Sequence, residues 1–130
     1  MASLGMRKAT NLSYDQALAA LPELLKSEGF GIITEIDMRE TLKKKIDADI
    51  RPYKILGACN PHFAHEALAA ELDIGIMLPC NVAVYEGDDG KAVVATVDPL
   101  KAMASHDSPA VATLATKVRG RLEQVLAKLG

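Results

Sequence analysis

The sequence predicts an α+β domain with a mostly antiparallel sheet. Strands and helices alternate in the first half of the chain, a strand hairpin follows around the turn sequence GDDG, and a long amphipathic helix forms the C-terminus. This order favours an α+β arrangement over a doubly wound parallel sheet. The chain has 130 residues, a length at which one domain can bury its own core, so we expect a single domain over residues 1–130.

The N-terminal third is expected to pair an edge strand with a helix. Residues 6–11 predict the strand, and Ser13 with Gln16 has the form of a capping box that opens the helix. Gly29 supplies a left-handed terminator, and Pro22 predicts a kink or local loosening. The apolar side of this helix consists of Ala17, Leu18, Leu21, Leu24 and Leu25.

A strand and a short basic helix are expected next. Residues 30–37 predict a strand of the buried type, and Asp37 repeats the capping pattern for a helix over residues 38–46. We expect Leu42 and Ile46 to face the core, with the lysines of this helix in solvent.

The run KILGACNPHFAHEAL, residues 54–68, predicts a strand that turns into a helix. Asn60 and Pro61 match an N-cap followed by proline at the first helical position. Further along, Pro79 cannot donate a hydrogen bond in a sheet, so we expect a bend there and a strand from Cys80 to Tyr85.

The C-terminal third is expected to hold the second hairpin strand and two helices. Asp98 with Pro99 is another cap-and-proline pair, which predicts a short helical turn. Ser108 with Pro109 begins the final helix. Its apolar stripe consists of Val111, Leu114, Ala115, Val118, Leu122, Val125, Leu126 and Leu129.

Composition excludes several classes of protein. Hydrophobic residues make up 49% and charged residues 25%, which is ordinary for an ordered globular protein. A net charge of -2 provides no basic field for nucleic acid, so we expect no such partner. The N-terminus lacks a signal-peptide core, and no apolar run approaches the roughly 20 residues of a membrane span. We expect a cytoplasmic protein, without membrane contact, whose two cysteines are reduced.

Cys59 is the residue most suited to chemistry. It closes a strand and precedes a helix whose free amides point back toward the strand end, which can lower a thiol pKa or hold an anion. The alternative is that Cys59 is a small buried apolar residue and Asn60 only a cap. Glu35 and Asp37 share one face of a strand and could act as paired acids, although a capping role is favoured for Asp37.

A metal site at the same place is weakly indicated. Cys59, His62 and His65 have the spacing C-x-x-H-x-x-H, and Cys80 could supply a fourth ligand for zinc. The usual pair of histidines on a helix is spaced by four residues, and the pattern fixes no carboxylate partner. We therefore expect solvent-facing histidines, no metal and no cofactor.

Four separated motifs, GFGIITEID, PYKILGACNP, LPCNVAVYE and VDP, resemble the bacterial and archaeal family known as domain of unknown function 302. The resemblance covers nearly the whole chain. It implies a compact fold similar to that of the TATA-binding protein, with helices on one face of a curved antiparallel sheet, and no established activity; it does not imply DNA binding. The family pattern covers Glu35, Lys54, Cys59, Asn60, Pro61, Pro79, Cys80, Asp98 and Pro99.

The repeated Cys-Asn pair leads to a hypothesis for function. We expect a pocket that binds a small anionic or thiol-reactive ligand, lined by Cys59, Asn60, Cys80 and Asn81, with Lys54 or Glu35 near its rim. At least one thiol should be more acidic than the free value of about 8.5. One alternative is a cysteine-dependent redox or transfer enzyme in which one thiol attacks and the other resolves. Another is a structural or interaction module; in each case we expect a homodimer.

Overall fold

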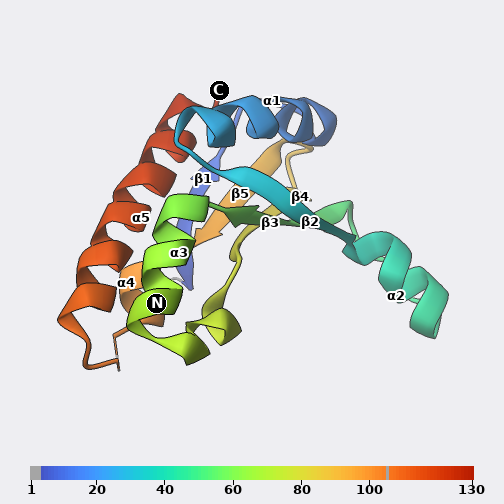
Figure 1. Cartoon of the computed structure of the whole chain (residues 1–130). Coiled ribbons are helices and arrows are strands. Elements are labelled where there is room, and N and C mark those ends of the chain that lie inside the picture. The colour runs from blue at the N-terminus through green and yellow to red at the C-terminus, as the bar shows by residue number, and fades with distance from the viewer. Residues whose placement is uncertain (1–3, 105) are drawn as a thin grey trace.

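The computed structural model describes residues 4–104 and 106–130, which form one open five-stranded sheet with helices packed on it. Helices α1, α3, α4 and α5 gather on one side of the sheet, and α2 projects away from it (Figure 1). The elements in chain order are β1 (Gly5–Ala9), α1 (Tyr14–Ser27), β2 (Gly31–Asp37), α2 (Met38–Ile46), β3 (Tyr53–Cys59), α3 (Pro61–Ala70), the 3-10 helix η1 (Leu72–Met77), β4 (Cys80–Glu86), β5 (Ala92–Val97), α4 (Pro99–Ala102) and α5 (Pro109–Lys128). The predicted α+β class is confirmed.

The strands lie in the order β1-β5-β4-β3-β2, and every neighbouring pair is antiparallel. The predicted antiparallel sheet is therefore confirmed. The order puts β1 and β2 at the two edges, as expected for β1. It also brings the end of β3 beside the start of β4, where Ala58 pairs with Cys80.

The core lies between the sheet and the two long helices. Its largest fully buried side chains are Leu21, Leu25, Leu122, Val82, Val84, Val94 and Val125. They come from α1, α5 and the central strands β4 and β5, because alternate residues of a strand point to the same face. Burial of this apolar surface is the main favourable contribution to folding.

Local capping signals were read correctly from the sequence. Ser13 and Gln16 form the predicted capping box, in which each side chain accepts a hydrogen bond from the other residue's backbone N–H. Gly29 adopts a left-handed φ of 86° after α1. Helix α1 continues through Pro22, where we predicted a kink or loosening and no break.

Two expectations about β2 and α2 were wrong. Strand β2 is mostly exposed, although residues 30–37 had the composition of a buried strand. In α2 no residue is fully buried, and Ile46, expected to face the core, is 69% exposed. The strand order places β2 at an edge of the sheet, where it pairs only with β3, and the helix that follows it extends past the sheet (Figure 1).

Over the described ranges, none of the helices has the combination of length and apolarity that crossing a membrane requires.

The packing of α5 predicts the effect of a core truncation. Leu122 has no solvent exposure, so Leu122→Ala should lower the free energy of unfolding by about 2 to 5 kcal/mol in urea denaturation. Gln124→Ala, on the exposed side of the same helix, is the matched control and should change it by less than about 0.5 kcal/mol. A neutral Leu122 variant would contradict the placement of α5.

Candidate functional site

A pocket lies at the end of the sheet where β3 stops and β4 starts. Its walls come from these strand ends and from α3, η1, α4 and α5. Apart from Cys59, Cys80 and Asn60, the described residues that line it are all apolar. The centre of a water molecule could occupy a volume of about 70 Å³ inside the pocket. This is several times the volume that one buried water needs. The pocket is therefore large enough for a small apolar group.

The two cysteines that line this pocket lie on neighbouring strands, close to one another in the register. Cys80 pairs with Ala58, so Cys59 lies one residue beyond that pair, where β3 ends. Both cysteines are free and half-buried, and both line the pocket. Both cysteines thus line one pocket, and a shared ligand site for their thiols stays a prediction.

The apolar walls affect the chemistry of Cys80. Burial raises the pKa of its thiol to about 11, and the nearby Cys59 adds a smaller effect in the same direction. Proximity to a helix N-terminus was expected to make at least one thiol more acidic. Cys80 does not meet that expectation, because burial disfavours the charged form of its thiol.

Asn60 lines the pocket, and its side chain makes hydrogen bonds to two other parts of the chain. Its side-chain Oδ1 accepts a hydrogen bond from the backbone N–H of Phe63 at 3.4 Å, which confirms the predicted N-cap of α3. Its Nδ2 donates to the carbonyl oxygen of Glu28, also at 3.4 Å. Both polar groups of this side-chain amide therefore make hydrogen bonds within the protein.

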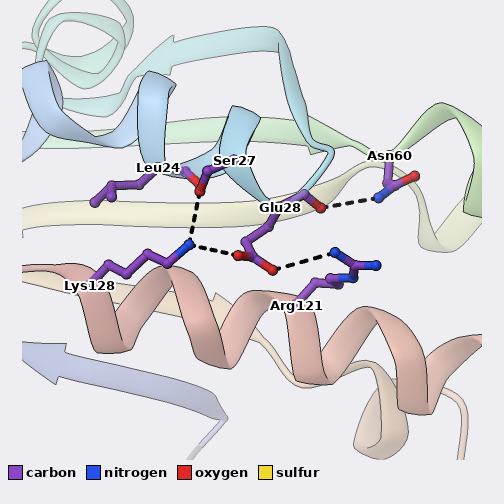
Figure 2. Close-up of polar contacts among 6 residues, drawn as sticks. All are labelled: Leu24, Ser27, Glu28, Asn60, Arg121 and Lys128. Carbon is purple, nitrogen blue, oxygen red and sulfur yellow. Dashed lines mark hydrogen bonds and ion pairs between the residues drawn. The ribbon is translucent and has the colours of Figure 1, made fainter.

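Glu28 anchors this junction, as Figure 2 shows. Its carboxylate is 11% exposed and lies 2.7 Å from Lys128 Nζ and 3.7 Å from Arg121, both on α5. The hydrogen bond from Lys128 lowers the pKa of Glu28 more than burial raises it. Sequence reasoning missed this residue. The available signal was an acidic side chain at a helix C-terminus, where the helix dipole disfavours it unless tertiary cations are present.

Asp98 fixes α4 against α5 on the far wall. Its Oδ1 accepts a hydrogen bond from the backbone N–H of Leu100 at 3.1 Å, and its Oδ2 lies 3.2 Å from Arg119 Nε. The predicted cap-and-proline pair at Asp98 and Pro99 is confirmed, and Pro99 itself lines the pocket.

Three of the expected site residues lie elsewhere. Asn81 is exposed and does not line the pocket, since it follows Cys80 on a strand and points to the opposite face. Glu35 and Lys54 form an ion pair of 2.8 Å between β2 and β3, and this contact raises the pKa of Lys54. Lys54 precedes Cys59 by five residues, about 16 Å along a strand, so this ion pair is not at the rim of the pocket.

The weak zinc motif does not assemble. His62 and His65 are both exposed on α3, whereas Cys59 faces the pocket. Among the described residues, no group of three or more His, Cys, Asp or Glu side chains could hold a metal ion.

The sequence and the fold were compared with known proteins. A family model described as "Domain of unknown function DUF302" matches residues 6–129. The chain belongs to the DUF302 family. It is also similar to the crystal structure of an uncharacterized conserved DUF302 protein from Bacillus stearothermophilus, with a TM-score of 0.91 and 28% sequence identity over 99% of this chain and 100% of that chain. No curated protein matches the chain. The family membership inferred from the four motifs is confirmed.

The contact between Gly29 and Asn60 can be tested by substitution. A Cβ at Gly29 would lie 2.8 Å from Asn60 Nδ2, and the φ of 86° is strained for any other residue. Gly29→Ala should lower the free energy of unfolding in urea by about 1 kcal/mol or more. Gly31→Ala, where an added Cβ meets no atom within 4 Å, is the control and should have a much smaller effect.

The Glu28 ion pairs predict a dependence of stability on pH. Because the folded-state pKa lies below the ordinary value of 4.5, the carboxylate stabilises the fold above that pH, and the contribution is lost as pH falls through the folded-state pKa. Glu28→Gln should therefore be less stable than wild type at pH 7, and the difference should shrink below pH 4.5. Denaturant unfolding across this range measures it, with exposed Glu66→Gln as control. A difference independent of pH would contradict the ion-pair account.

Proposed function

We propose that this DUF302 protein binds a small, apolar, thiol-reactive molecule in the pocket, with Cys59 as the reacting thiol. The observation that supports this most is that both cysteines line one pocket whose other described residues, except Asn60, are apolar. Ligand pockets are typically apolar with a few polar groups that fix orientation. An anionic ligand has less support, because the described residues that line the pocket include no cation.

The assignment to Cys59 follows from the state of Cys80. With a pKa of about 11, the Cys80 thiol is ionised in only about one molecule in ten thousand at pH 7. The thiolate is the nucleophilic form, so Cys80 serves as a lining group. Cys59 lies at the strand end, one residue before the capped N-terminus of α3.

The ligand class that fits is a small uncharged electrophile such as an α,β-unsaturated carbonyl compound. The Cys59 sulfur would form a bond to the β-carbon as the carbon–carbon π bond breaks, the proton of the broken S–H bond would pass to the α-carbon, and no group would leave. This addition needs no oxidant and no cofactor, and the apolar walls would bind the hydrocarbon part of the molecule.

A thiol redox enzyme is the second candidate, favoured by the presence of two thiols in one pocket. Cys59 would attack a peroxide, and Cys80 would then attack the Cys59 sulfenic acid to give a disulfide and water. The raised pKa of Cys80 slows that second step, which ranks this function below ligand binding.

Selective alkylation tests the proposal. Neutral iodoacetamide should modify one thiol of the folded protein, Cys59, and Cys80→Ser should react as wild type does while Cys59→Ser does not. The rate ratio of iodoacetamide to anionic iodoacetate should exceed the ratio for free cysteine, because the pocket excludes charge.

Three results would count against the proposal. A preference for iodoacetate would favour an anionic ligand, and two inert thiols would leave only a structural role. A Cys59–Cys80 disulfide that forms with peroxide and turns over with a dithiol would favour the enzyme. Native mass spectrometry of fresh protein adds the mass of any bound molecule and the number of subunits; the homodimer and the cytoplasmic location remain predictions.

A further inference from the structure

Four sulfur-bearing residues from four separate parts of the chain line the pocket. Cys59 ends β3, Cys80 begins β4, Met77 ends η1, and Met103 follows α4, and all four line the same space. They are both cysteines of the chain and two of its five methionines. Packing alone does not require sulfur at these positions, since leucine has nearly the same volume as methionine.

We propose that this pocket binds one copper(I) ion through the Cys59 thiolate and the thioethers of Met77 and Met103. The inference rests on the proposed function only in using the same pocket and the same reactive thiol. Thiolate and thioether ligands select soft monovalent copper, whereas imidazole and carboxylate suit zinc, iron and harder ions. The described residues that line the pocket include no histidine and no carboxylate.

Charge balance also favours a monovalent ion. The residues described in the walls are apolar apart from Asn60 and the two cysteines, so a site with net charge would be costly here. Copper(I) with one thiolate and two thioethers is neutral, but a divalent ion would need two thiolates for neutrality. On binding, the Cys59 S–H bond breaks, its proton passes to solvent, and a sulfur–copper bond forms; the oxidation state of copper does not change.

Met77 provides a route for the ion. Its side chain is 37% exposed, although it also lines the pocket. A thioether at the surface can accept copper(I) from solution or from a donor protein and pass it inward. Met103 is half-buried on another wall, so the two thioethers reach the space from η1 and from the end of α4.

Competition for copper tests the inference. Reduced protein is titrated without oxygen with copper(I), supplied as its acetonitrile complex, against the chromophoric chelator bathocuproine disulfonate. Wild type should bind one copper(I) and release one proton for each ion bound. Met77→Leu with Met103→Leu should weaken binding at least about tenfold, and Cys59→Ser should weaken it further. Met6→Leu is the matched control, since Met6 packs on the core outside the pocket, and it should bind copper as wild type does.

The outcomes separate this inference from the proposed function. Failure of wild type to compete for copper, or equal affinity in the double methionine variant, overturns the copper site. Release of two protons for each ion overturns the single-thiolate complex. The double methionine variant retains Cys59, so its modification by iodoacetamide reports on the proposed function alone. If Cys59 is inert to iodoacetamide while wild type binds copper, the proposed function fails and the copper site stands.

Discussion

The fold depends on how Glu28 joins three helices at one point. Its backbone carbonyl accepts the hydrogen bond from Asn60 that holds the start of α3, and its carboxylate meets two cations of α5. A carboxylate this buried is tolerated only because those partners compensate for lost water. Cys59 directly precedes Asn60 in the chain, so this junction lies next to a residue that lines the pocket.

The chemistry of the pocket follows from its place at the end of the sheet. Strands β3 and β4 bring both cysteines to one pocket, and the helices that cover the sheet partly shield them from water. The same apolar walls that could bind a hydrocarbon also keep Cys80 protonated. The side-chain amide of Asn60 already makes two hydrogen bonds within the protein. The two cysteine sulfur atoms are therefore the polar groups of this site that remain for a ligand.

The sequence predicted features that depend on neighbouring residues and missed those that depend on distant ones. Caps at Ser13 and Asn60 were found because an N-cap bonds to amides two or three residues away. Exposure of Ile46 was missed because it depends on strand order, which composition does not encode. Glu28 was missed because its partner Lys128 lies 100 residues further along the chain. The pKa of Cys80 likewise depends on walls built from segments far away in the sequence.

The projecting helix α2 has a consequence for motion. It contributes no fully buried residue, so it can open and close without disturbing the packing between the sheet and α5. Its amide hydrogens should then exchange with solvent through small local fluctuations, while those in the buried part of α5 are released only when the whole domain unfolds. Hydrogen exchange would then distinguish α2, with no fully buried residue, from the helices that cover the pocket.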